Sequence, residues 1–240
     1  MKRILDEADR LGMVSIVGYF YFGQSPRLKT DENVVCATDT SVRRLLEGGW
    51  HNILVEINNE LHPGYNPPIL RPDRVHELIA RVRRTRSADG RRLLVGTSFP
   101  VKVMPTFEAV VESDFVLVHG NAFKTPSEPV GKVRATRALD PKRTIPVMVN
   151  EDDHDNFEAP DGRRASCVAE HVSWGWFDWR RKGEPFDEGY QSVPVNWQIG
   201  SDRKRRFHRR VAEITGFDAG HPSTANQRFR NRCFLNGQNI

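Results

Sequence analysis

Cysteine is scarce in this sequence. The three cysteines, Cys36, Cys167 and Cys233, lie far apart and form no C-x-x-C pair. This spacing excludes a disulfide framework and argues against a cysteine metal site. We therefore expect Cys36 and Cys167 to be inert thiols, with Cys167 on a buried helix face.

Long apolar runs and glycine-rich phosphate loops are also absent. No stretch approaches the roughly 20 apolar residues of a membrane-spanning helix, and Asp6 and Glu7 come too early for a signal peptide. The first strand-to-helix turns carry no G-x-G-x-x-G pattern, which argues against dinucleotide binding. The sequence thus predicts no membrane partner and no cofactor, and it leaves the localisation open.

Basic residues exceed acidic ones, which raises the question of a nucleic-acid partner. The chain of 240 residues carries a net charge of +5, with arginine-rich stretches over 81–92 and 203–210. In the second stretch Phe207, Val211 and Ile214 have helical spacing, so we expect them to be buried and the arginines to be solvated. No nucleic-acid-binding motif accompanies these arginines. We predict no nucleic-acid partner; a phosphate-binding stripe remains the alternative.

Short apolar runs alternate with amphipathic stretches along the chain. The predicted strands are 13–20, 53–57, 93–96, 115–118, 145–149 and 174–177, and the predicted helices are 1–11, 39–47, 72–82, 105–111, 129–139, 165–172 and 201–215. Strands that are apolar without alternation are buried on both faces, which is typical of a parallel sheet. The fold class is therefore α/β, and either a doubly wound sheet or a (β/α)8 barrel fits. We expect one domain over 1–216 and a loosely structured tail over 217–240.

Polar or aromatic residues follow every predicted strand at its carboxyl end. In chain order they are Tyr19, Tyr21 and Gln24; Asn58, Asn59, Glu60 and His62; Thr97 and Ser98; His119 and Asn121; Asn150 and Glu151; Trp176, Asp178 and Trp179. In a parallel barrel these ends converge on the face where the chemistry occurs. The same residues are therefore the candidates for a functional site.

Two of these strand ends carry a glutamate directly after an asparagine. Glu60 follows Asn59, and Glu151 follows Asn150. Glycoside hydrolysis needs two carboxylates, one to protonate the leaving oxygen and one to attack the anomeric carbon or activate water. Glu56, four residues before Glu60, is a rival to it on the same predicted strand. It faces the same way, so the alternative is a carboxylate of a second layer in the barrel, and we rank Glu56 below Glu60.

These motifs resemble those of the retaining (β/α)8 glycoside hydrolases, the cellulase- and mannanase-like enzymes of family 5 and its relatives. In that clan an acid/base Glu follows an Asn at the end of strand 4, and the nucleophile Glu ends strand 7. The resemblance implies that Glu60 is the acid/base, Glu151 the nucleophile and Asn59 the contact to the sugar 2-hydroxyl.

Other strand ends match the clan less closely. His119 falls where the clan often has a His-x-Tyr motif, but Asn121 stands in place of the Tyr that would orient the nucleophile. The resemblance implies that Trp176 or Trp174 floors the sugar subsite. We also predict that His119, Asn121, Asn150, Tyr19 and Tyr21 bind substrate, although a structural role for His119 is equally open.

The count of units leaves the barrel incomplete. If Glu60 ends strand 4, the chain holds strands 3 to 8, about six βα units, and we expect an N-terminally truncated barrel whose open edges would favour association. The implied function is retaining hydrolysis of a β-linked oligo- or polysaccharide; the alternative is an inactive fragment or a carbohydrate-binding remnant. The acidic loop over 151–155 lacks the spacing of an EF-hand, so we predict no metal.

Overall fold

The computed structural model describes residues 1–142, 145–153, 156–159, 161–177, 180–185, 188 and 200–216. The chain divides into two compact units, Met1–Phe177 and Asp178–Ile240. The predicted tail over 217–240 lies outside the described residues, as do Cys233, His154, Asp155, Asp178 and Trp179. The predicted domain boundary at residue 216 stays a prediction.

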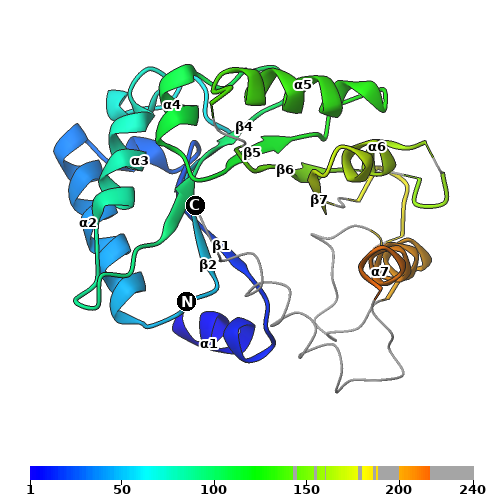
Figure 1. Cartoon of the computed structure of the whole chain (residues 1–240), viewed down its shortest axis with the longest axis horizontal. Coiled ribbons are helices and arrows are strands. Elements are labelled where there is room, and N and C mark those ends of the chain that lie inside the picture. The colour runs from blue at the N-terminus through cyan, green and yellow to red at the C-terminus, as the bar shows by residue number, and fades with distance from the viewer. Residues whose placement is uncertain are drawn as a thin grey trace. The chain divides into compact units, whose positions relative to one another are not determined.

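Helices and strands alternate through the first unit (Figure 1). In chain order they are α1 (Lys2–Arg10), β1 (Ser15–Tyr21), the 3-10 turn η1 (Ser25–Arg27), α2 (Asp31–Glu47), β2 (Ile53–Asn59), η2 (Pro68–Leu70), α3 (Val75–Arg84), β3 (Leu94–Gly96), β4 (Ser98–Phe99), α4 (Phe107–Glu112), β5 (Val116–His119), α5 (Ser127–Ala138), β6 (Val147–Asp152), α6 (Arg163–Ala169) and β7 (Ser173–Trp176). All six predicted strands are present, with ends that differ by a few residues.

All strand pairs in this unit are parallel, in the orders β1-β2-β3 and β4-β5-β6-β7. Only Thr97 separates β3 from β4, and its carbonyl accepts a hydrogen bond from Leu117 N at 3.1 Å. β3 and β4 therefore act as one interrupted strand between β2 and β5. A doubly wound sheet reverses its strand order at a switch point, whereas here six strands follow one another as in a barrel wall. The six predicted units are confirmed, and the doubly wound alternative is excluded.

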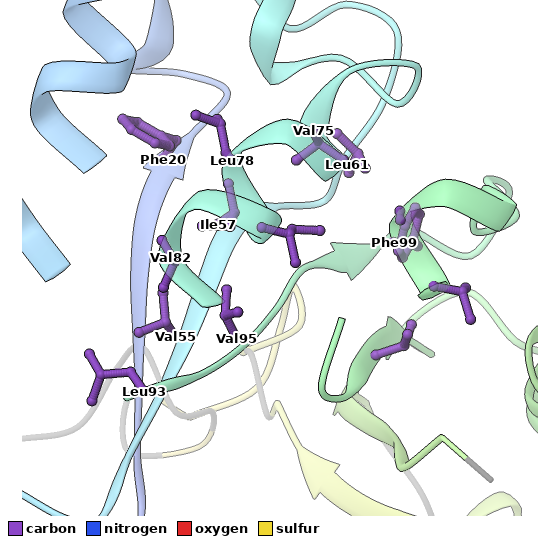
Figure 2. Close-up of a cluster of buried hydrophobic side chains, with 14 of the residues drawn as sticks. Phe20, Val55, Ile57, Leu61, Val75, Leu78, Val82, Leu93, Val95 and Phe99 are labelled. Carbon is purple, nitrogen blue, oxygen red and sulfur yellow. The ribbon is translucent and has the colours of Figure 1, made fainter. Parts of the chain in front are cut away.

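The main core lies between the strands and the helices that cover them. Val55 and Ile57 of β2 and Val95 of β3 pack near Leu78 and Val82 of α3 (Figure 2), and each is at most 1% exposed. Burying a side chain of this size contributes roughly 1.5–3 kcal/mol. Because side chains alternate along a strand, Glu56 points to the opposite face of β2 from Val55 and Ile57.

Helix α2 is longer than its apolar pattern predicts. It begins at Asp31 rather than near residue 39, and the Thr30 side chain caps it by accepting from Asn33 N at 3.3 Å. The polar Thr38 interrupts the buried stripe, but its hydroxyl donates to Val34 O within the helix. A satisfied hydroxyl can be buried at little cost, so the apolar pattern alone underestimates this helix.

One further boundary differs from prediction. Pro72 was expected in the first turn of a helix, but α3 begins at Val75 and Pro72 lies in the preceding turns.

Cys167 is fully buried on α6, as expected, and Cys36 is a free, exposed thiol. No helix among the described residues has both the length and the apolar character of a membrane span.

The second unit contains α7 (Asp202–Thr215), the helix predicted over 201–215. Ser201 caps it, and Gly216 ends it with φ of 67°. The stripe predicted to be buried is wrong in part, because Val211 and Ile214 are exposed by 38% and 45%. The described contacts of the helix lie instead on the side of Arg203, which pairs with Glu184 at 2.7 Å.

Candidate active site

Three strand ends bring Glu60, His119 and Glu151 together. The Nδ1 atom of His119 lies 3.2 Å from Glu60 Oε1 and 3.1 Å from Glu151 Oε2. One nitrogen and two carboxylate oxygens of this triad lie within 4.8 Å of one another. His119 is fully buried, whereas the two carboxylates are partly exposed. The fold thus places two accessible carboxylates on either side of one buried imidazole.

The backbone at Glu60 is held in an unusual conformation. Its φ is 52°, in the left-handed region, which costs a non-glycine residue roughly 1–2 kcal/mol. Ser98 offsets this cost from the neighbouring strand, because its Oγ accepts from Glu60 N at 2.8 Å and its carbonyl accepts from Leu61 N at 2.8 Å. Strain of this kind is concentrated at functional sites.

Glu151 is oriented by the segment that follows β5. Asn121 donates from Nδ2 to Glu151 Oε1 at 2.8 Å, and Gly120 N donates to Glu151 O at 2.6 Å. The register between β5 and β6 shifts next to His119, so that His119 faces Glu151 across the two strands. Such an irregularity re-aims side chains at the end of a strand. Asn121 therefore contacts the carboxylate that the missing Tyr of the clan motif would orient.

Hydrogen bonding controls the ionisation of Glu60. The hydrogen bond with His119 lowers the pKa of the Glu60 carboxyl below its usual value, more than partial burial raises it. The same three side chains have a spacing that a divalent cation could use. His119 Nδ1 is also within hydrogen-bond distance of both carboxylates.

A buried ion pair supports the segment that carries Glu151. Asp152 is fully buried, and it accepts from Arg163 Nε at 3.1 Å and from Trp174 Nε1 at 2.9 Å. Arg163 also donates to Phe123 O at 2.6 Å, which ties the segment after β5 to the end of β6. Burial raises the pKa of Asp152 to about 6 against these partners. The sequence suggested only a polar loop here, because the partners come from distant elements.

The predicted substrate-binding residues on β1 and β2 do not all lie at the strand ends. Asn59 ends β2 beside Tyr21 of β1, and Tyr21 is 46% exposed and stacks on Phe22 at 4.3 Å between ring centroids. Tyr19 packs against the main core, and alternation puts it on the opposite face from Gly18, the residue beside Glu56. The structure therefore brings Tyr21 and Asn59 to the strand ends but does not bring Tyr19 to the carboxylates.

The candidates on β6 and β7 lie near Glu151. Asn150 has a buried Oδ1 atom with no hydrogen-bond partner among the described residues. Trp176 is half-buried, pairs with Asp152 across β6 and β7, and packs edge-on against Phe157. Trp174, the alternative to Trp176, is bound to Asp152 through its ring nitrogen, which leaves Trp176 as the better-placed indole.

An aromatic group near Glu60 was missed at the sequence level. Phe22 contacts His62 edge-on at 5.7 Å, and His62 contacts Tyr65 at 5.1 Å between ring centroids. Tyr65 is fully buried, and its hydroxyl donates to the Asn59 carbonyl. Phe22 and Tyr65 lie beyond the predicted strands, so only their proximity to the polar strand ends could have indicated them.

Comparisons with known proteins agree on the fold and give no relative by sequence. No family model matches the chain, and no curated protein matches its sequence. A solved endo-1,4-β-mannanase from Rhizomucor miehei aligns with a TM-score of 0.51 and 11% identity, over 73% of this chain and 65% of that one. A broad-specificity endoglucanase, GH5-4, from Clostridium longisporum aligns with a TM-score of 0.52 and 12% identity, over 89% and 75% of the two chains.

A third solved structure, GH26C from Muricauda sp. MAR_2010_75, has a TM-score of 0.52 and 10% identity, over 88% of this chain and 70% of that chain. The fold is that of a (β/α)8 barrel, the fold of these solved structures. At these identities the likeness concerns the fold alone. The barrel described here is partial, and the chain spans less than two thirds of the length of the mannanase.

Proposed function

We propose that the chain is a glycoside hydrolase that cleaves a β-linked oligo- or polysaccharide with retention of anomeric configuration. Glu60 is the acid/base and Glu151 the nucleophile. The observation that supports this most directly is the placement of the two carboxylates at separate strand ends, with one oxygen of each within 4.8 Å of the other.

The spacing of the carboxylates favours retention over inversion. Retaining glycosidases hold their two carboxyl groups about 5–5.5 Å apart, and inverting ones about 6.5–9.5 Å apart to admit a water molecule. The separation of Glu60 and Glu151 fits the shorter class. Direct attack by a carboxylate is therefore favoured over activation of a water molecule in the first step.

In the first step, Glu151 attacks the anomeric carbon and the bond to the leaving oxygen breaks. Asn121 holds Glu151 Oε1, and Oε2, which lies 3.1 Å from His119 Nδ1, is the oxygen that we assign to the ester bond. Glu60 gives its proton to the leaving oxygen, which departs as an alcohol. A bound sugar excludes water from Glu60, and desolvation raises the pKa of a carboxyl, which favours the protonated form that this step needs.

In the second step, Glu60 takes a proton from water and the hydroxide attacks the anomeric carbon, releasing Glu151. Once Glu151 is esterified, it no longer bears a negative charge beside Glu60. Loss of a neighbouring like charge lowers the pKa of a carboxyl, which suits Glu60 to act as a base. His119 Nδ1 lies 3.2 Å from the acid/base Glu60 and 3.1 Å from the nucleophile Glu151, so the imidazole contacts both carboxylates.

The substrate class rests on the fold and on the aromatic strand ends. The solved barrels with this fold include an endo-1,4-β-mannanase and an endoglucanase. In this chain, Tyr21 and Trp176 are aromatic residues at strand ends and are at least partly exposed, and Asn59 and Asn150 are amides directly before the two glutamates. Aromatic faces and a few convergent polar groups are the usual lining of such a site.

The test is a panel of β-linked mannans, glucans and aryl glycosides, with proton NMR of the first anomer released. We expect turnover with retention, and we expect Glu151→Gln to abolish turnover while the melting temperature stays nearly unchanged. The control is Glu158→Gln, which alters an exposed glutamate on the following turn. Turnover by Glu151→Gln, or an inverted product, would contradict the proposal; binding without turnover by the wild type would indicate a carbohydrate-binding remnant.

A further inference from the structure

A third carboxylate, Glu56 of β2, precedes Glu60 by four residues and has no place in the proposed reaction. Its side chain is only 7% exposed. Its neighbours in register are Gly18 on β1 and Gly96 on β3, so no side chain flanks it in that layer of the sheet. A Cβ atom on Gly18 would lie 3.4 Å from Glu56 Oε2, so this carboxyl oxygen occupies the space above the glycine.

Few groups around Glu56 would stabilise a negative charge on its carboxyl group. Its Oε1 atom is buried and has no hydrogen-bond partner among the described residues. Its side chain is hydrogen-bonded to Ser98, and the other titratable groups around it are His119, Glu151, Glu60 and Tyr65. Two of those groups are themselves carboxylates. An ionised carboxylate that is buried without full hydrogen bonding is costly, and nearby like charges add to that cost.

Burial accordingly raises the pKa of Glu56, and the charges of Glu151 and Glu60 raise it further, whereas Ser98 and His119 oppose the rise. The pKa of Glu60, the residue directly after β2, changes in the opposite direction because its hydrogen bond with His119 lowers it. Two carboxyl groups whose environments separate their pKa values in this way take different protonation states and different roles.

Ser98 connects the two glutamates. Its Oγ atom accepts from Glu60 N at 2.8 Å and donates to Asn58 O at 3.3 Å, and it is also a hydrogen-bond partner of the Glu56 side chain. The Glu60 amide that it holds belongs to the residue with φ of 52°. The chain of contacts from Glu56 through Ser98 therefore ends on the strained backbone that aims Glu60.

We propose that Glu56 is a buried, uncharged carboxylic acid that positions Glu60 through the Ser98 hydroxyl. As a neutral acid, it fills the layer beneath Glu60 and Glu151 without adding a third negative charge to the site. Glu56 is a positioning residue, since it acts through Ser98. Its effect on catalysis rests on the proposed glycosidase function, whereas its protonation state does not.

Infrared spectroscopy of the full chain tests the protonation state directly. We expect the C=O stretch of a protonated carboxyl in the wild type that Glu56→Gln lacks, and we expect this band to persist as pH rises above the range in which ordinary glutamates ionise. The difference between the wild type and Glu56→Gln removes the contribution of Asp152, whose pKa is raised to about 6. If the wild type lacks the band, or if Glu56→Gln retains it, the proposal is overturned.

Thermal melts against pH provide a second test, with Glu60→Gln as the matched control. A carboxyl with a raised folded-state pKa contributes stability that is complete below its unfolded pKa of about 4.5 and is lost as pH rises through the folded value. The melting temperature of the wild type relative to Glu56→Gln should therefore fall with rising pH. Relative to Glu60→Gln it should rise instead, because the pKa of Glu60 is lowered. The same sign for both variants would refute a neutral Glu56.

The positioning role is tested by Ser98→Ala on the substrate found for the wild type. We expect kcat to fall about tenfold with KM little changed, because one hydrogen bond to the Glu60 backbone is lost. The control, Ser113→Ala, removes another fully buried serine, and we expect it to affect stability but not kcat. An unchanged kcat in Ser98→Ala refutes the positioning role. A wild type without turnover refutes the proposed function, while the infrared and melting tests of Glu56 still apply.

Discussion

Removal of the His119 imidazole should change how Glu60 and Glu151, the two carboxylates proposed to be catalytic, titrate. His119 Nδ1 lies 3.2 Å from Glu60 and 3.1 Å from Glu151, and no other group among the described residues bridges them. In His119→Ala, Glu60 and Glu151 would have carboxylate oxygens within 4.8 Å of each other and no imidazole between them. Their repulsion then favours protonation of one of them.

The magnitude follows from Coulomb's law. Two unit charges 4.8 Å apart, the upper limit of this separation, repel by about 3.5 kcal/mol at an effective dielectric constant of about 20, which corresponds to about 2.5 in pKa. This repulsion also acts in the wild type, where the hydrogen bond with His119 counters it, so the change in the variant is the loss of that counteracting bond. The Glu60 and Glu151 side chains are 30% and 21% exposed, so solvent screening reduces the effect. We expect the pKa of Glu60 to rise by about 1–2 in His119→Ala.

The assay is the pH dependence of kcat/KM. Its alkaline limb reports the general acid of the free enzyme, so the limb should move to higher pH in His119→Ala. His62→Ala is the matched control, because His62 lowers the pKa of Glu60 less than His119 does, and its limb should move less. If activity is too low, carbon-13 NMR of the glutamate carboxyl groups gives the same titration. An alkaline limb that stays in place or moves to lower pH would refute the reasoning.

Three further predictions concern orientation, burial and packing. Asn121→Ala removes a 2.8 Å hydrogen bond to the Glu151 carboxylate. A hydrogen bond to a carboxylate is worth about 1.5–3 kcal/mol, so kcat/KM should fall by about 10- to 100-fold. A smaller change would show that Asn121 does not orient Glu151. Burial raises the pKa of Asp152 from 3.8 to about 6, so its contribution is complete below the lower value and lost as pH rises through the upper one; thermal melts should show the wild type losing stability relative to Asp152→Asn over that interval, and a gain would contradict the assignment. Ile57→Ala empties a fully buried site and should lower the free energy of unfolding by about 2–5 kcal/mol in denaturant titrations; Ile4→Ala, at a side chain 72% exposed, should cost less than about 0.5 kcal/mol, and equal costs would contradict the packing described.

Local patterns in the sequence predicted the secondary structure well. Apolar runs such as 53–57 and 145–149 became parallel strands, because residues buried on both faces of a sheet show no alternation. The start of α2 was missed because the buried Thr38 is satisfied by Val34 O, a bond that hydropathy does not reveal. Helix-capping by Ser201 and Gly216 was predicted correctly, since capping depends on neighbouring residues only.

The sequence by itself determined which residues are candidates for the site. Glu60 and Glu151 were singled out because each follows an asparagine at the end of an apolar run, a feature that depends on a few adjacent positions. The parallel arrangement of the strands followed from their composition in the same way. Sequence patterns could not choose between a doubly wound sheet and a barrel, because both use the same alternating units.

Tertiary structure alone decided the strand order and the contacts among the candidates. The consecutive order of the strands excludes the doubly wound sheet, and the irregular register beside His119 brings its ring to both carboxylates. The link from Ser98 to the left-handed backbone of Glu60 joins residues 38 positions apart. These contacts depend on how distant segments pack, and hydropathy and local propensity do not encode which distant residue a side chain will meet.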